Sequence, residues 1–315
     1  MNKQVCVYLG EPLADYHFGA AHPFGPQRLP AFEKEFYRRR LHNAVSVCEP
    51  VSCSSNDLRL FHDSNYIDFV KSASDQGKGY LDGGDTPVRQ GIYEAACFVV
   101  GSTLDGVDRI MRGECQRSFI PIAGLHHARR NSAAGFCVFN DCGVAIEKLF
   151  QVYGLESVAY VDIDAHHGDG VFYGFEDNPA LCYVDFHEDG RFLYPGTGAV
   201  EETGKNAAKG TKLNIPMPMY ADDQLFFDIW SKVEAFVVSA RPQFILLQCG
   251  VDSVSGDPIT HLQYTSRVHA HVTKRLCELA VKLCEGRFLA MGGGGYNLDN
   301  LALTWNDVVA AMAES

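Results

Sequence analysis

Short apolar runs alternate along the chain with longer segments in which apolar side chains recur at helical spacing. The short runs predict strands at residues 4–9, 117–122, 158–161, 180–184, 212–215, 243–250 and 287–291. The longer segments predict helices at residues 30–41, 63–74, 89–111, 222–239 and 261–284, one that ends at about residue 152, and a terminal one. This repetition of strand, loop and helix predicts one α/β domain over residues 1–315, in which helices cover both faces of a parallel sheet.

Polar residues follow the apolar run Val158–Val161 abruptly. Within eight positions come three acids and two imidazoles: Asp162, Asp164, His166, His167 and Asp169. If the chain stays extended, alternate residues share a face, so Asp162, Asp164 and His166 converge in a way that suits a divalent cation. Strand ending and helix capping would explain one acid and one glycine but not the whole group, because buried charges are costly unless paired or bound to metal.

Further polar residues stand where other predicted strands end. They are His126 and His127, Asp185 and His187, Asp252, and Tyr296 in the run GGGGYN. Open parallel sheets bind ligands outside the carboxyl ends of their strands. We therefore expect these groups to gather with the Asp162–Asp169 segment on one edge.

Three of these residues form a candidate metal site. Asp164, His166 and Asp252 would supply three ligands and leave one position open, as catalytic zinc sites do. A metal in that site would polarise a substrate carbonyl and acidify a water molecule.

Proton transfer needs further groups. His126 and His127 are the candidate bases, and Asp162 and Asp169 are the acids available to orient them. The phenol of Tyr296, carried on a glycine-rich turn, could stabilise a developing oxyanion.

The composition of the chain limits the classes of molecule that it is expected to bind and the compartment in which it is expected to occur. The net charge of −12 argues against direct nucleic-acid binding and is compatible with a cationic substrate, although acidity also simply aids solubility. No apolar run reaches the ~18 residues of a membrane span, and MNKQVCVYLG lacks the features of a signal peptide. The eleven cysteines include no CxxC pair, so we expect buried thiols in a cytoplasmic protein and no thiolate zinc site.

Other enzyme classes lack their sequence signals. The glycines at 292–295 do not have the GxGxxG spacing of a dinucleotide loop, and no GxSxG nucleophile elbow occurs. We interpret His269 and His271 as packing or surface residues and Cys137 as a packing residue.

Assembled in order, these motifs resemble the zinc-dependent histone deacetylase family of the arginase/deacetylase superfamily. The similarity runs nearly the whole length and is closest to the bacterial acetoin-utilisation type and the class I deacetylases. Its motifs are HPFGPQR, FHDSNYIDFV, GGDTPVRQGIYEAA, GLHHARRNSAAGFCVFND, YVDIDAHHGDGV, FHEDGRFLYPGTG, CGVDSVSGDP and GGGGYN.

The resemblance implies an eight-stranded parallel sheet with a catalytic metal at its carboxyl edge. Asp164, His166 and Asp252 would bind Zn²⁺, although Fe²⁺ also suits such a donor set. His127 with Asp169 would be general base and acid, His126 with Asp162 would assist electrostatically, and Tyr296 would bind the oxyanion.

The resemblance also implies substrate and ion contacts. Gly135, Phe136 and Tyr194 would line a tunnel for the acyl-lysine stem, Asp85 would hold the substrate backbone, and Ile259 would lie at the mouth. Arg28 would lie near an internal acetate route. A structural K⁺ would lie near Asp162, Asp164, His166, Asp185 and Phe186.

Several positions depart from the family pattern. Tyr194 replaces a more usual Phe, and Asp185 stands where a Ser often contributes to the K⁺ site. Asn178 and Thr211 differ at a second alkali-metal site. Ile259 is apolar where polyamine-selective relatives carry an acid, which argues against a dedicated polyamine enzyme.

The sequence thus predicts a metal-dependent deacylase that hydrolyses the amide of an N-acylated lysine, in a peptide, a protein or a small acylated amine. It predicts neither nucleic-acid nor membrane partners. The alternatives are an N-acetylpolyamine deacetylase, a two-metal ureohydrolase and an inactive acyl-lysine binding module.

Overall fold

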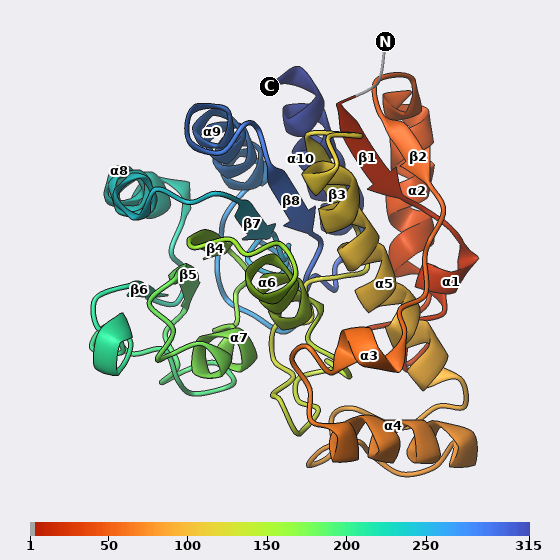
Figure 1. Ribbon diagram of the computed structural model, residues 1–315. Helices are drawn as coiled ribbons and strands as arrows, with labels where there is room; N and C mark the ends of the chain where they lie inside the picture. Colours follow the sequence, from red (N-terminus) through yellow and green to blue (C-terminus); the bar gives the residue numbers. More distant parts are fainter. Residues whose placement is uncertain (1–3) are drawn as a thin grey trace.

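The computed structural model describes residues 4–315, and these residues contain one eight-stranded sheet (Figure 1). The strands are β1 (Val5–Tyr8), β2 (Ser46–Cys48), β3 (Arg117–Ile120), β4 (Val158–Asp162), β5 (Leu181–Glu188), β6 (Lys212–Met217), β7 (Ile245–Gln248) and β8 (Phe288–Met291). They lie in the order β2-β1-β3-β8-β7-β4-β5-β6, and each neighbouring pair is parallel. Residues 1–3, part of the segment that we interpreted as lacking an export signal, lie outside this range.

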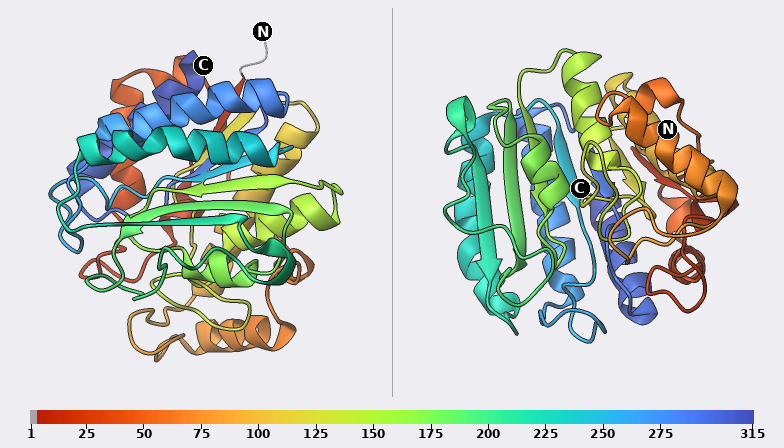
Figure 2. Two further views of the ribbon diagram at one scale, coloured as in Figure 1. Left: turned by 90° about the vertical axis from the view of Figure 1, so that its left-hand side faces the viewer. Right: turned by 90° about the horizontal axis from the view of Figure 1, so that it is seen from below.

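Helices cover both faces of the sheet. They are α1 (Glu11–Ala14), α2 (Arg28–Arg38), α3 (Ser55–Leu58), α4 (Ser64–Gln76), α5 (Ile92–Met111), α6 (Asp141–Gln151), α7 (Asp169–Gly174), α8 (Asp223–Ala240), α9 (Ser266–Leu283) and α10 (Leu298–Glu314). Helices α2, α10, α9 and α8 follow one another over one face, and α5, α6 and α7 cover the other (Figure 2). The predicted α/β class and two-sided covering are confirmed.

The central strands are buried along their whole length, as expected for a parallel sheet between two helical layers. This burial explains why they appear in the sequence as short, uninterrupted apolar runs. In the described part of the chain, no helix has the length and apolar character needed to cross a membrane.

The strand that the hydrophobic pattern missed is β2. It has three residues, only one of which is buried, and it pairs with β1 alone at the edge of the sheet. Such a short, half-exposed segment has no periodicity to detect.

Most element boundaries differ from the prediction by a few residues, and those of β5, α9 and α2 are examples. Strand β5 runs beyond Val184 to Glu188, because its acids and imidazole are buried with polar partners and do not mark a loop. Helix α9 begins at Ser266 and not at residue 261, since the Thr265 hydroxyl caps it by accepting the N–H of Arg267. Helix α2 begins at Arg28, two residues before the predicted start.

The strand order determines where the polar residues meet. Strands β3, β8, β7 and β4 are consecutive neighbours in the middle of the sheet. Because they are parallel, the segments that follow them leave the sheet at the same edge. Those segments carry the tandem histidines, Tyr296, Asp252 and the Asp162–Asp169 group.

Candidate active site

The candidate metal ligands form one compact, buried group. Nδ1 of His166 lies 3.0 Å from Oδ1 of Asp164 and 3.1 Å from Oδ2 of Asp252. The three ligand atoms lie within 4.8 Å of one another, and the three side chains are almost fully buried. Among the residues that the structure describes, this is the one group of three or more acidic, imidazole or thiol side chains close enough to hold a metal ion.

Neighbouring polar groups fix the two carboxylates. Oδ2 of Asp164 accepts hydrogen bonds from Gln248 Nε2 at 2.9 Å and from the N–H of Gly294 at 2.8 Å, and Oδ1 of Asp252 accepts from the N–H of Ala165 at 2.9 Å. The sequence analysis did not single out Gln248. The sequence feature that could have indicated it is a polar residue at the end of the apolar strand β7.

Two glycines let the backbone approach these carboxylates. A Cβ atom on Gly250 would lie 1.9 Å from Oδ2 of Asp164, and one on Gly294 would lie 2.1 Å from Oδ2 of Asp252. No side chain fits at such distances. The glycine run at 292–295 therefore closes the wall of the candidate metal site.

The donor set suits a divalent cation. The carboxylates of Asp164 and Asp252 are held close together away from water, and this burial and the charge of Asp164 raise the pKa of Asp252. A cation between them would offset this repulsion. Two carboxylates and one imidazole fit Zn²⁺ or Fe²⁺.

The tandem histidines face different acids. Nδ1 of His126 lies 2.8 Å from Oδ2 of Asp162, the last residue of β4, and Nδ1 of His127 lies 2.8 Å from Oδ1 of Asp169, the first residue of α7. Their Nε2 atoms are 3.1 Å apart. The chain leaves the strand at Asp162, so the extended arrangement considered for Asp162–His166 does not occur.

Two further residues hold catalytic candidates in place. Nη2 of Arg129 donates to Oδ2 of Asp169 at 3.1 Å, and Oδ2 of Asp257 accepts the backbone N–H of Tyr296 at 2.8 Å. Sequence reasoning missed both. Arg129 lies in the HHARR segment and Asp257 in SGDP, so each was a charged residue next to a motif already recognised.

The predicted tunnel residues lie beside His127 and Tyr296. The ring of Tyr194 lies 5.1 Å from that of His127, and the ring of Phe136 lies 5.9 Å from that of Tyr296, each edge-on. A Cβ atom on Gly135 would lie 2.5 Å from the His127 ring, which is why a glycine is needed there.

The predicted rim residues lie further out. Asp85 and Tyr194 line one surface hollow of about 480 Å³ together with Arg129. Burial and the neighbouring Asp82 raise the pKa of Asp85 to about 6. Ile259 is half-buried, and its N–H donates to the same Asp257 that holds Tyr296.

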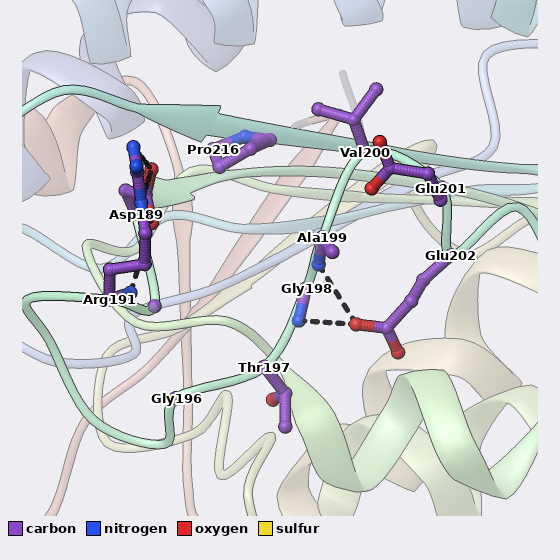
Figure 3. Close-up of a pocket in the computed structure, with 11 residues that line it drawn as sticks. Asp189, Arg191, Gly196, Thr197, Gly198, Ala199, Val200, Glu201, Glu202 and Pro216 are labelled. Atoms are coloured by element: carbon purple, nitrogen blue, oxygen red, sulfur yellow. Dashed lines mark hydrogen bonds and ion pairs between the residues drawn. The ribbon is translucent and has the colours of Figure 1, made fainter.

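The segment 189–202, which carries Tyr194, is braced from its other side. A second cavity of about 420 Å³ lies there, and three of its charged lining groups, Asp189, Arg191 and Glu202, have partners within the segment (Figure 3). Oε1 of Glu202 accepts the N–H groups of Gly198 and Ala199, both at 2.9 Å, and Arg191 pairs with Asp189 at 2.6 Å. These bonds order the segment before and after Tyr194.

Comparison with known proteins identifies the family. The family model described as "Histone deacetylase domain" matches residues 22–312. The chain belongs to the histone deacetylase family.

Relatives span bacteria, plants and fungi. The chain is 36% identical over 306 residues to the acetoin utilization protein AcuC of Bacillus subtilis, with 95% of this chain and 79% of that protein covered. It is 32% identical to histone deacetylase 19 of Arabidopsis thaliana (97% and 61% covered) and 30% identical to histone deacetylase clr6 of Schizosaccharomyces pombe (99% and 77%). The crystal structure of the HDA15 HD domain superposes with a TM-score of 0.90 at 26% identity, covering 99% of this chain and 90% of that one.

Membership of the histone deacetylase family supports a hydrolytic deacetylase activity in general. It also confirms the resemblance inferred from the motifs. The eight-stranded parallel sheet that the resemblance implied is present in residues 4–315.

Arg28, which the family resemblance associates with an acetate route, is buried behind the candidate site. Its Nε donates to the carbonyl of Gly295 at 3.0 Å and its Nη2 to that of Gly293 at 2.6 Å. Nη1 has no hydrogen-bond partner among the described residues, and the guanidinium stacks 3.9 Å from the ring centre of Phe24. Burial lowers the pKa of Arg28.

The residues that the resemblance assigned to a K⁺ site have protein partners of their own. The Asp185 carboxylate faces Nδ1 of His187 at 2.8 Å and accepts the N–H of Gly168 at 2.8 Å as well as the hydroxyl of Tyr183. Phe186 packs its ring on Phe226. Only the backbone carbonyl of Phe186 could therefore bind K⁺.

A lysine lies where the resemblance placed a second alkali-metal site. Nζ of Lys212 donates to the carbonyls of Asn178 at 2.9 Å and Leu181 at 2.7 Å and to Oγ1 of Thr211 at 2.9 Å. The side chain is buried, and burial lowers its pKa to about 8.

Proposed function

We propose that this protein hydrolyses the amide of N-acylated lysine side chains, with acetyl as the first acyl group to test, and releases a carboxylate and a free amine. The observation that carries the proposal is the position of the His127–Asp169 pair beside the buried Asp164, His166 and Asp252 group. A base next to a three-ligand site with an open position is the arrangement required for metal-assisted hydrolysis.

Zn²⁺, with Fe²⁺ as the alternative, would be held by Asp164, His166 and Asp252, where it would polarise the scissile carbonyl and lower the pKa of water. Nδ1–H of His127 is directed at Asp169, which leaves Nε2 as the atom that accepts a proton and returns it to the leaving amine. Arg129 in turn fixes Asp169.

Two further residues would stabilise charge. The Tyr296 phenol would donate a hydrogen bond to the oxyanion, from a backbone position held by Asp257. Asp162 keeps His126 oriented, and His126 would assist His127 electrostatically.

The substrate would enter past the hollow that Asp85, Arg129 and Tyr194 line. Gly135, Phe136 and Tyr194 would enclose the lysine stem, and the carboxylate of Asp85 would accept substrate backbone N–H groups. Ile259 would contact the residues that flank the lysine.

Acetate would leave toward Arg28, whose free Nη1 can donate to a carboxylate. A K⁺ near Asp162, Asp164, His166, Asp185 and Phe186 would be structural.

N-acetylpolyamine hydrolysis is the second candidate. The net charge of −12 is compatible with a cationic substrate, although acidity also simply aids solubility. The apolar side chain of Ile259 would not bind a polyamine ammonium group, so we rank this function below lysine deacylation. A two-metal ureohydrolase would need more ligands than the single acidic cluster found in residues 4–315.

The deciding experiment compares turnover of the metal-loaded protein on an acetyl-lysine peptide and on N-acetylputrescine, each with and without a chelator. Faster, chelator-sensitive cleavage of the peptide is the expected result. Faster cleavage of N-acetylputrescine would favour the polyamine function, and binding of the peptide without cleavage would favour an inactive binding module.

A further inference from the structure

One residue of the tunnel wall has a strained backbone. Phe136 is a non-glycine residue with φ +66°, and it follows Gly135, which has φ +54°. Side chains with a Cβ atom rarely adopt this left-handed conformation, because it costs free energy that the surrounding structure must supply. The orientation of the Phe136 ring therefore depends on the groups that hold its backbone.

Hydroxyl groups from two distant segments hold that backbone. The N–H of Phe136 donates to Oγ1 of Thr86 at 3.1 Å, and its carbonyl accepts from the hydroxyl of Tyr16 at 2.7 Å. The same Tyr16 oxygen accepts the N–H of Val138 at 3.0 Å. Thr86 and Tyr16 are both buried, so water cannot replace either bond.

Thr86 also contacts the rim. Its Oγ1 lies 3.1 Å from Oδ1 of Asp85 and is hydrogen-bonded to Oδ2 of Asp82. A hydroxyl has one proton but two lone pairs, so Thr86 can accept from Phe136 while donating to one of the two carboxylates. One buried oxygen thus joins the strained wall residue to the rim acid.

Hydrogen bonds to Asp82 order the loop that carries both acids. Oδ1 of Asp82 accepts the N–H groups of Gly84, Asp85 and Thr86 at 2.9, 3.1 and 3.0 Å. His22 adds a second brace, with its Nε2 3.2 Å from the carbonyl of Asp85 and its ring edge-on to Phe136 at 4.6 Å.

We propose that Thr86 is a positioning residue that holds the Phe136 wall and the Asp85 rim in one fixed arrangement, so that a substrate whose backbone docks at Asp85 has its acyl-lysine stem aligned against Phe136. This inference rests on the proposed function. With Asp85 occupied by substrate N–H groups, the Thr86 proton goes to Asp82, and its lone pair continues to hold Phe136. The Thr86 hydroxyl bonds to Asp82, Asp85 and Phe136, so it acts through the rim and the wall and not through the metal ligands or Tyr296.

The test compares Thr86→Val, which keeps the shape and removes the hydroxyl, with Thr86→Ser, which keeps the hydroxyl. Leaving the buried N–H of Phe136 without a partner should lower kcat/KM for an acetyl-lysine peptide about tenfold, mainly through KM. Thr86→Ser should recover most of that loss. Equal values of KM for the Val and Ser variants would overturn the proposal.

A double-mutant cycle tests the link to the rim. If Thr86 aligns the wall with the rim at Asp85, Thr86→Val should add little to the loss already caused by Asp85→Ala. Fully additive losses would show that the two residues act independently, and the proposed alignment would be wrong.

A binding measurement separates this inference from the proposed function because it needs no turnover. Thr86→Val should weaken a hydroxamate whose alkyl chain is as long as the lysine stem and leave acetohydroxamate, which has no stem, unaffected. Equal weakening of both would indicate general distortion and overturn the role of Thr86. A wild-type protein that cleaves no acylated amine would overturn the proposed function, and the hydroxamate comparison would still decide the role of Thr86.

Discussion

Nε2 of His126 lies 3.1 Å from Nε2 of His127, while Nδ1 of each ring faces its own buried carboxylate. The adjacent imidazoles therefore stand in different environments. Burial opposes protonation of both, but Asp162 and Asp164 outweigh it at His126 and raise its pKa to about 10. At His127, burial and the charge of His126 lower the pKa to about 4.

The unequal environments predict unequal effects of substitution. His127→Gln should lower kcat about 10²- to 10⁴-fold, as expected for loss of a general base, and His126→Gln should lower it less. Both variants should keep their bound metal, which elemental analysis would measure. A larger loss in the His126 variant would mean that the two roles are exchanged.

Removal of the Tyr296 hydroxyl should reduce turnover selectively. Tyr296→Phe keeps the ring contact with Phe136 and the backbone bond to Asp257, so it removes only the donor. We expect kcat to fall about 10²- to 10³-fold with metal content unchanged. Activity near that of the wild type would exclude the oxyanion role.

Metal binding should stabilise the fold, because it offsets the repulsion between the carboxylates of Asp164 and Asp252. Zn²⁺ at 100 times its Kd should add about 2.7 kcal/mol to the free energy of unfolding. Denaturant titrations with metal and with chelator would measure the difference. Asp252→Asn is the control, and Zn²⁺ should stabilise this variant much less than the wild type. Equal stabilisation of both proteins would place the metal elsewhere.

Acid should destabilise the protein through His62. This imidazole is buried between two backbone groups: it accepts the N–H of Asn140 at 2.9 Å, and its Nδ1 faces the carbonyl of Arg130 at 3.3 Å. Burial lowers its pKa to about 3. The unfolded chain therefore binds a proton as the pH falls below about 6.5 while the folded chain does not, so stability is lost in that direction.

His62→Gln removes this titration and tests it. Relative to the variant, the wild type should lose about 2 kcal/mol more of its unfolding free energy between pH 7 and pH 5. Urea titrations of both proteins at the two pH values give the difference, in which contributions from other histidines cancel. Parallel pH dependence of the two proteins would rule out His62 as the source.

The ammonium group of Lys212 should take the place of a bound alkali-metal ion. Lys212→Met leaves the carbonyls of Asn178 and Leu181 and the Thr211 hydroxyl without their donor, which should cost about 1–3 kcal/mol of stability. KCl should restore part of this stability in the variant and have less effect on the wild type. Choline chloride is the control, since its cation is too large; an equal response to both salts would indicate a general ionic-strength effect.

The sequence alone predicted most of the strands and the metal-ligand candidates that lie close together in the chain. The apolar runs located seven of the eight strands in residues 4–315, because central parallel strands are buried on both faces and contain few polar residues. The ligand candidates Asp164 and His166 lie two positions apart in one motif. Their type alone indicates metal chemistry, and parallel topology placed Asp252 at the same edge.

The tertiary structure alone decided how these residues are held. Gln248, Arg129 and Asp257 are single polar residues, and nothing in their local pattern shows that they fix Asp164, Asp169 and Tyr296. The same holds for Thr86 and Tyr16, which meet at Phe136 from segments 50 and 120 residues away.

The sequence by itself determined the class of fold and the chemical groups, because hydrophobic periodicity and residue type are local properties. The family resemblance assigned an acid to each histidine, but the geometry of these pairs, the left-handed backbone of Phe136 and the ammonium of Lys212 among backbone carbonyls were decided by packing. Such contacts join positions far apart in the chain, and their distances exist only once the sheet has brought the strand ends together.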